Sequence, residues 1–184
     1  MFLIHDSAWT FDTSAGAGAG LGVVVASGGM VRLKDPGGTP ISFYFGGIGA
    51  AISTPSLRIP KIPKIKFPGW KAPSAAAAGS TPDFKSYGVV YRKSMFGTKE
   101  LVADDFRGAC IYCEGGAGLI GGISVDIMFF GASTAIAAAV AGATAGLGVG
   151  AALVASSNGI LAWGGVNIGP QAGAGIGGLI GGMR

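Results

Sequence analysis

The amino-acid sequence predicts an α+β fold: an antiparallel β-rich N-terminal and middle part, then an Ala/Gly-rich apolar helix or helical hairpin in the C-terminal third. Short apolar or alternating runs, separated by glycine and proline, occupy residues 14–52 and 87–113, and this pattern is typical of antiparallel strands. Residues 127–183 carry no formal charge and are rich in alanine, the strongest helix former.

The N-terminal region, residues 1–52, is predicted to form two hairpins. Its expected strands span residues 21–26, 30–34 and 41–45. Glycine and proline favour the chain reversals expected at Gly28-Gly29 and at Pro36-Gly37-Gly38. Residues 46–52 either extend the second hairpin or turn into a short helix.

Residues 53–82 differ from the rest of the chain because prolines recur throughout them, and proline is excluded from helix interiors and central strands. We expect an extended, polyproline-like linker. It carries no acid, and its predicted contacts with lipid headgroups are Arg58, Lys61, Lys64 and Lys66. Such a basic island suits anionic lipid or an acidic partner, or else it is a solvated loop. Nucleic acid is not expected as a partner, because no helix or stacking platform frames the lysines.

Strand-like sequence resumes in a second β-rich region, residues 83–125. Its expected strands span residues 88–92, 99–102 and 108–113. Between the last two strands, Asp104 is expected to cap a short helical turn.

The last region, residues 126–184, is predicted to enter a membrane. Residues 127–155 are uncharged and long enough for a bilayer-crossing helix, which needs about 20 residues. Residues 160–163 suit a strand or a second span, whereas residues 172–183 are too short to cross alone as a straight helix. Before insertion, all four regions are expected to form one compact domain.

Two glycine zippers are the strongest motifs of this last region. They consist of Gly142, Gly146 and Gly150, and of Gly173, Gly177 and Gly181. Residues four apart share a helix face, so each trio would form a groove of bare backbone that lets helices pack closely in lipid. These glycines are the predicted sites of membrane oligomerisation. The alternative is a buried hairpin of a soluble protein, packed closely through glycine.

No catalytic, cofactor or metal site is predicted, and the protein is not expected to be an enzyme. Cys110 and Cys113 have Cys-x-x-Cys spacing, but residues three apart in a strand point to opposite faces, which indicates packed thiols. His5, the only histidine, lacks a nucleophile motif to serve. Asp126 is expected to cap a helix or, alternatively, to line a polar pathway through a bilayer.

The zippers, the small size and the uncharged C-terminal region resemble the small glycine-zipper, pore-forming effectors of bacterial type VI secretion systems. The N-terminus agrees, because it lacks the basic segment of a secretory signal peptide. The resemblance implies synthesis in the cytoplasm, loading into the secretion tube protein, and delivery to the inner membrane of a competitor. There the protein would insert in the lipid bilayer as a homo-oligomer. A membrane-embedded immunity protein would protect the producing cell.

The predicted function is therefore a secreted antibacterial toxin that forms small ion-conducting pores and dissipates membrane potential without any cofactor. Glycine makes up 36 of the 184 residues, against a usual share of about 7%. Such a chain loses much conformational entropy in any single fold, which favours remodelling between environments. The alternatives are a soluble Gly-rich structural or lipid-binding β-protein without pore activity, and a thiol oxidoreductase.

Overall fold

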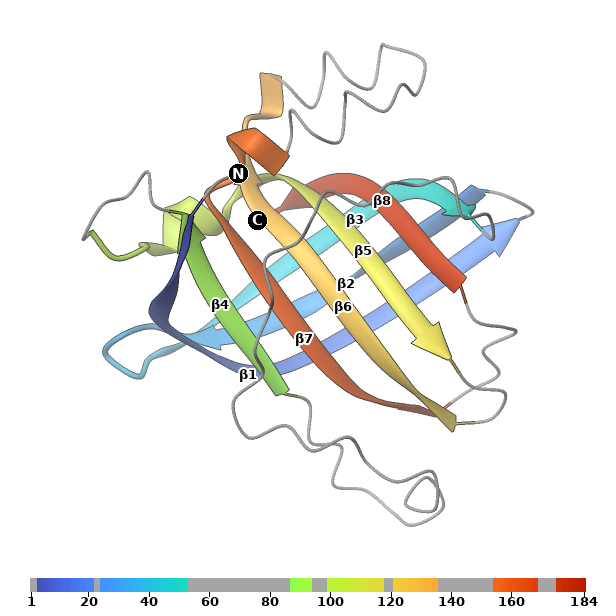
Figure 1. The fold of residues 1–184 in the computed structure, drawn as a ribbon, viewed down its shortest axis with the longest axis horizontal. Coiled ribbons are helices and arrows are strands. Elements are labelled where there is room, and N and C mark those ends of the chain that lie inside the picture. Colours follow the sequence, from blue (N-terminus) through green and yellow to red (C-terminus); the bar gives the residue numbers. More distant parts are fainter. Residues whose placement is uncertain are drawn as a thin grey trace.

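Eight antiparallel strands of the described residues close into a barrel (Figure 1). The structure is a computed structural model that describes residues 3–21, 24–52, 87–93, 99–117, 121–135, 154–168 and 175–184. The strands are β1 (Ile4–Leu21), β2 (Val24–Lys34), β3 (Pro40–Ile52), β4 (Tyr87–Lys93), β5 (Gly108–Ala117), β6 (Gly121–Ala132), β7 (Gly159–Ile168) and β8 (Gly175–Met183).

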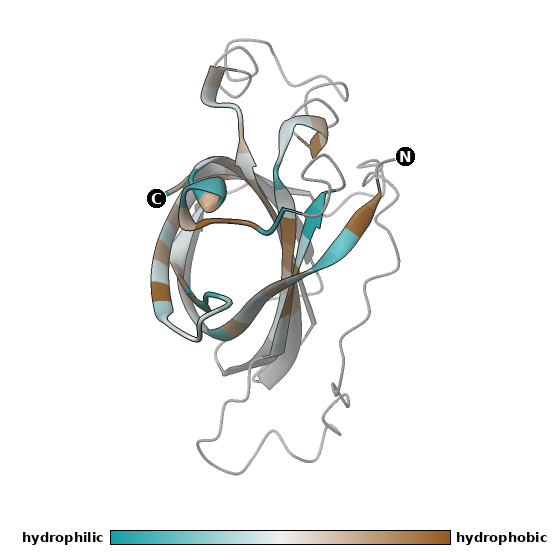
Figure 2. Ribbon diagram, turned by 90° about the vertical axis from the view of Figure 1, so that its left-hand side faces the viewer, coloured by the Kyte–Doolittle hydropathy of each residue, from teal (hydrophilic) through white to brown (hydrophobic). Residues whose placement is uncertain are grey.

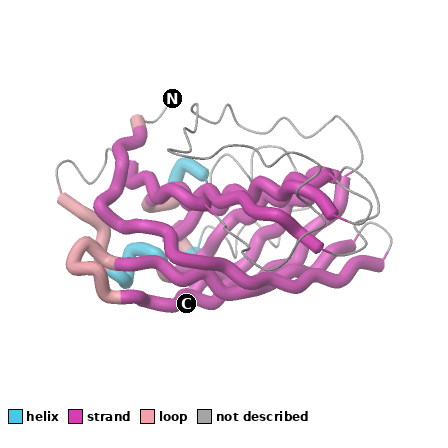
Figure 3. Tube along the Cα trace, turned by 90° about the horizontal axis from the view of Figure 1, so that it is seen from below, coloured by secondary structure: helices cyan, strands magenta, loops and turns pink. Residues whose placement is uncertain are grey.

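The order of strands around the barrel is β1-β2-β3-β8-β5-β6-β7-β4, and β4 pairs with β1 to complete the ring that Figure 2 shows. Seen from below, the strands run along the length of the molecule (Figure 3). Each strand therefore has a neighbour on both sides, but β4 is short. Its described pairing with β1 runs only from Ile4 to Thr10, and the rest of β1 pairs with β2 in the described part of the chain.

The hairpin between β2 and β3 confirms the reversal predicted at Pro36-Gly37-Gly38. The Gly38 N–H donates to the Asp35 carbonyl at 2.9 Å, and the Thr39 N–H donates to the Asp35 carboxylate at 2.8 Å. Gly38 has a φ of 86°, which a residue without a side chain adopts without strain. The strand then continues to Ile52, so residues 46–52 extend the hairpin as predicted.

The reversal predicted at Gly28-Gly29 is wrong. Both glycines lie within β2, where they pair with Gly46 and Phe45 of β3. The backbone of β3 comes so close that a Cβ at Gly28 would lie 2.9 Å from the Phe45 carbonyl oxygen. A glycine pair suits a turn or a close strand contact equally well, and here close contact is the reason for it.

The prediction of an α+β fold with a C-terminal helix or helical hairpin is also wrong, since the described residues form a barrel with no helix of seven or more residues. Residues 127–132, where the helix was expected to begin, belong to β6. Residues 160–163 belong to β7, which confirms the strand interpretation for that segment. Residues 136–153, the middle of the expected helix, lie outside the described residues.

Glycine costs roughly 0.5–1 kcal/mol in a helix and in a strand alike, so its own preference does not decide between them. Close approach of a neighbouring backbone decides for the strand, since a Cβ at Gly181 would overlap the backbone of Gly46. Strand β8 pairs with β3 and with β5. Within the described part of the chain, no helix has the length and apolar character needed to cross a membrane.

The middle region follows the prediction except around residues 99–107. The strands predicted at 88–92 and 108–113 are confirmed as β4 and β5, but residues 99–102 form no strand. They lead into a 3-10 turn, η3 (Ala103–Phe106). The N-cap residue of this turn is Val102 and not Asp104, and the Val102 N–H donates to the carboxylate of Asp105 at 2.8 Å.

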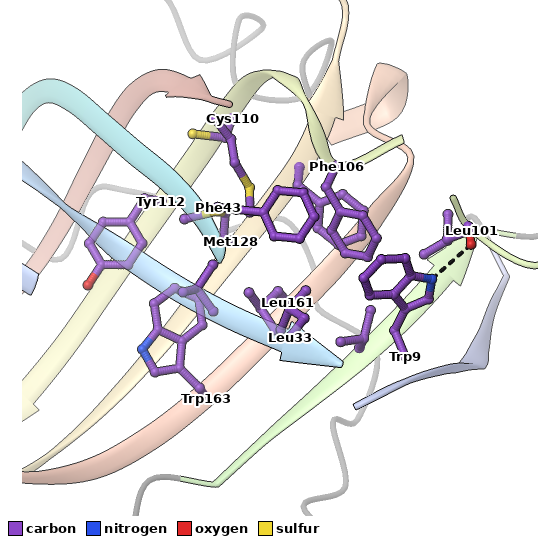
Figure 4. Packing of buried hydrophobic residues seen from close by; sticks show 14 residues of the cluster. Trp9, Leu33, Phe43, Leu101, Phe106, Cys110, Tyr112, Met128, Leu161 and Trp163 are labelled. Carbon is purple, nitrogen blue, oxygen red and sulfur yellow. Dashed lines mark hydrogen bonds between the residues drawn. The ribbon is translucent and has the colours of Figure 1, made fainter. Parts of the chain in front are cut away.

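Alternation along the strands separates an inner from an outer set of apolar side chains. The inner set fills the barrel and includes Trp9, Leu33, Phe43, Met128 and Trp163 (Figure 4). The outer set lies on the opposite faces of β4, β5, β6 and β7, and it includes Tyr91, Ile111, Phe129 and Ile160. Apart from Tyr87 of β4, which is 38% exposed, the described large apolar side chains of these four strands are buried or half-buried.

Candidate functional site: the covered end of the barrel

Aromatic side chains fill one end of the barrel around Phe106, which is fully buried. Its ring centroid lies 4.4 Å from that of Phe130, 4.7 Å from that of Trp9 and 5.0 Å from that of Phe43. Aromatic pairs at such distances contribute roughly 0.5–1.5 kcal/mol each beyond the area they bury. The four rings come from η3 and from β6, β1 and β3, so this end is closed by side chains of distant segments.

Residues 99–107, which we call the lid segment, place Phe106 in that end. The indole N–H of Trp9 donates to the buried carbonyl of Leu101 at 2.8 Å, the bond drawn in Figure 4. The Asn158 side-chain amide donates to the Asp105 carbonyl at 2.9 Å. The lid segment is therefore attached to β1 on one side and to the start of β7 on the other.

Glu100 is the main polar anchor of the lid segment. Its carboxylate accepts hydrogen bonds from the Ser7 hydroxyl at 2.6 Å and from the Ala8 and Leu101 N–H groups at 2.9 Å each. The Arg92 guanidinium lies 3.9 Å away. Burial favours the neutral acid, but the hydrogen bonds and the positive charge together outweigh burial and lower the pKa of Glu100.

Asp126 does not cap a helix, because it lies within β6. It is buried on the strand face that also carries Met128 and Phe130, and it pairs in register with Trp163 of β7. The helix-cap prediction failed because the helix that it would have capped is a strand. The other interpretation, that Asp126 lines a polar pathway, stays a prediction.

The two cysteines lie on opposite faces of β5, as their spacing predicted. Cys110 is buried in the barrel interior, and Cys113 packs against the outer apolar set. Both are free thiols. His5 is exposed on β1, where it pairs in register with Arg92.

The predicted zipper residues have different outcomes. Gly177 and Gly181 lie in strand β8, so the helical face expected from them is not formed. Gly181 pairs with Gly47 of β3 and with Cys110 of β5. The predicted sites outside the described residues are Gly142, Gly146, Gly150, Gly173, Arg58, Lys61, Lys64 and Lys66.

The roles of Glu100 and Phe106 were not predicted from the sequence. The partners of Glu100, Ser7 and Ala8, precede it by 93 and 92 residues, so no local pattern indicates the contact. The available signal in the sequence was the short helical element at residues 103–106, in which two acidic residues precede a phenylalanine. A phenylalanine at the end of such an element indicates a side chain that packs into the core.

The fold and the closed end define a small antiparallel β-barrel protein, filled and covered at one end. The chain is 33% identical over 187 aligned residues to toxin protein Tse4 of Pseudomonas aeruginosa, and the match covers 98% of this chain and 95% of that protein. The chain belongs to the Tse4 toxin family. No protein-family model matches it, and no solved structure matches it significantly.

Proposed function

We propose that the protein is an antibacterial toxin, exported by a type VI secretion system, that inserts in the inner membrane of the recipient cell and dissipates its membrane potential through small pores. Similarity to toxin protein Tse4 along nearly the whole chain is the observation that carries the toxin assignment. In this proposal the toxin needs neither a catalytic residue nor a cofactor, because ion flow alone causes the damage.

Closure of the barrel supports the membrane part of the proposal. A bilayer core has no water to bond unpaired backbone groups, so only helices and closed barrels span it. Here every strand has a paired neighbour on both sides over at least part of its length. Eight strands also suffice for the smallest outer-membrane barrels. A barrel wall therefore takes the place of the helical zipper as the proposed membrane-spanning element.

In this proposal the closed end belongs to the form of the toxin that exists before insertion. Phe106 is fully buried there, and the ring centroids of its aromatic neighbours lie 4.4 to 5.0 Å from its own. Conduction then requires the lid segment to move away from β1 and β7. Its polar anchor at Glu100 is a small set of hydrogen bonds near the surface, and these break more easily than a buried core.

The proposed partners are the lipid bilayer, the tube protein of the secretion system, further copies of the toxin in the membrane, and a membrane-embedded immunity protein. A toxin aimed at related bacteria endangers its producer, which is the reason to expect the immunity protein. The net charge of +4 favours approach to the anionic inner membrane.

Expression in a bacterium, with and without a periplasmic targeting signal, tests this function. A potential-sensitive dye should report depolarisation when the protein is in the periplasm, and a cytosolic marker enzyme should stay inside the cells. Folded protein that accumulates in both compartments without depolarisation would contradict pore formation. Release of the marker enzyme together with depolarisation would indicate lysis and would contradict small pores.

A second candidate function is a lipid-binding barrel without pore activity, and the filled interior is the observation that favours it. Purified protein added to vesicles that hold a potassium gradient separates the two functions. A pore-forming toxin dissipates the potential, whereas a lipid-binding barrel binds the vesicles and leaves the potential unchanged.

A further inference from the structure

One wall of the barrel carries large apolar side chains that are exposed on its outer face. On β3, Phe43 points into the core, and the alternate residues Tyr44 and Ile48 are 57% and 68% exposed. Between them lies Gly46, also exposed. On β4, β5, β6 and β7, by contrast, outer residues such as Phe129 and Ile160 are buried. The wall of β2, β3 and β8 thus presents two exposed large apolar side chains, Tyr44 and Ile48, on its central strand β3.

The polarity of this wall changes in one direction along the strands. Arg32 of β2 lies beside Ser42 of β3, with Arg32 Nε 3.4 Å from the serine oxygen. Tyr44 comes next, and its backbone exchanges two hydrogen bonds of 2.9 Å with Arg184. Both arginines are exposed. Two cationic groups therefore flank Tyr44.

Beyond Tyr44 the described outer positions of the wall carry no charge. Gly46 pairs with Gly28 of β2 and Gly182 of β8, and Ile48 pairs with Ala26. The order along the wall is therefore cationic, aromatic and then small or aliphatic. Membrane proteins show this order where they pass from lipid headgroups to acyl chains.

The dimensions agree with this order. Ile48 follows Tyr44 by four positions along the strand, a rise of about 13 Å at 3.3 Å per residue. With the strand tilted by about 45°, Ile48 lies roughly 9 Å deeper than Tyr44, within the half-thickness of about 15 Å of the hydrocarbon core. Tyr44 then lies at the interface, where aromatic side chains are enriched in barrels.

The geometry points to the wall of β2, β3 and β8 as the surface that docks on an anionic bilayer, with Arg32 and Arg184 at the headgroups, Tyr44 at the interface and Ile48 among the acyl chains. This inference rests on the proposed function. It adds an orientation: the β2–β3 hairpin stays on the aqueous side, and the barrel enters by the other end of β3.

Matched lysine substitutions test the inference. Ile48→Lys and Leu3→Lys add the same charge at exposed aliphatic positions, since Leu3 is 65% exposed just before β1. Protein bound to phosphatidylglycerol vesicles is washed with concentrated salt, which removes electrostatic adsorption. Wild type and Leu3→Lys should stay bound, whereas Ile48→Lys should be retained about tenfold less, because a lipid-facing lysine is costly.

A second comparison tests the headgroup contacts. Replacing both Arg32 and Arg184 by serine should weaken binding to phosphatidylglycerol vesicles about tenfold or more, with no change on phosphatidylcholine vesicles. Equal weakening on both lipids would overturn the electrostatic part of the inference.

Ion flux distinguishes the inference from the function on which it rests. If wild type resists the salt wash but passes no ions, the pore proposal fails and the docking wall stands. If wild type passes ions and Ile48→Lys is retained and conducts like wild type, the docking wall is overturned and the pore proposal stands. Thermal melting of each variant in solution confirms that the substitutions at these exposed positions leave the barrel folded.

Discussion

Two adjacent glycines of β8 meet different surroundings, and this difference can be tested residue by residue. A Cβ at Gly181 would overlap the carbonyl of Gly46 on the neighbouring strand, whereas a Cβ at Gly182 would lie 3.7 Å from its nearest neighbour, the Gly108 carbonyl oxygen. We expect Gly181→Ala to lower the free energy of unfolding by about 1–3 kcal/mol, because backbone must move to admit the methyl group. Denaturant unfolding measures the change.

Gly182→Ala is the matched control for that substitution, since it makes the same chemical change one residue away. Its effect should stay within about 0.5 kcal/mol of wild type. Equal stability of the two variants would contradict the close approach of β8 to β3. If Gly181 lay in a helical zipper, Gly181→Ala should have little effect, because alanine is also accepted at small-residue helix contacts.

At the scale of elements, the lid segment should depend on the charge of Glu100. Glu100→Gln keeps the size of the side chain but weakens three hydrogen bonds to a carboxylate and removes the attraction to Arg92. We expect Glu100→Gln to lower the free energy of opening of the lid segment by about 1–2 kcal/mol. Hydrogen exchange at the amides of that segment measures this free energy. Asp104→Asn is the control, because the Asp104–Arg107 pair is exposed and contributes little.

The same carboxylate makes the lid segment sensitive to acid. Folding lowers the pKa of Glu100 from its ordinary value of 4.5. The carboxylate of Glu100 therefore binds a proton more tightly in the unfolded chain than in the folded protein. The stabilisation from Glu100 is therefore fully present above its ordinary pKa and is lost as the pH falls through the lowered value. In wild type, the denaturant midpoint should fall as the pH is lowered from 6. In Glu100→Gln, the midpoint should depend less steeply on pH. Identical slopes would rule out this contribution.

The elements also show which parts of the fold the sequence could predict. Strands β4 and β5 were predicted because alternating β-branched and aromatic residues have no competing helical interpretation. Strand β8 was missed because Gly177 and Gly181 lie four residues apart, and residues at that spacing share one face of a helix and also one face of a strand. Only pairing with β3 and β5 decides between them, and that pairing joins distant segments.

For the whole molecule, closure depends on contacts that no local pattern contains. Strand β8 inserts between β3 and β5, and β4 returns to pair with β1. The same holds for the site: Glu100 could be seen as an isolated acid, but its anchor at Ser7 and Ala8 exists only once the ring has closed. The sequence therefore indicates the elements of the barrel more readily than the order in which they join.

Two routes lead from the closed barrel to ion flux: opening of the lid segment alone, or unfolding of the whole barrel. If only the lid segment moves, Glu100→Gln should shorten the delay before vesicles depolarise, while Gly181→Ala, which strains β8 and β3, should leave that delay unchanged. If the whole barrel unfolds first, both variants should shorten the delay in proportion to the stability that each one loses. Potential-sensitive dye in potassium-loaded vesicles records the delay. We expect the first result, because the polar anchor of the lid segment lies near the surface, whereas the strands of the barrel are paired on both sides.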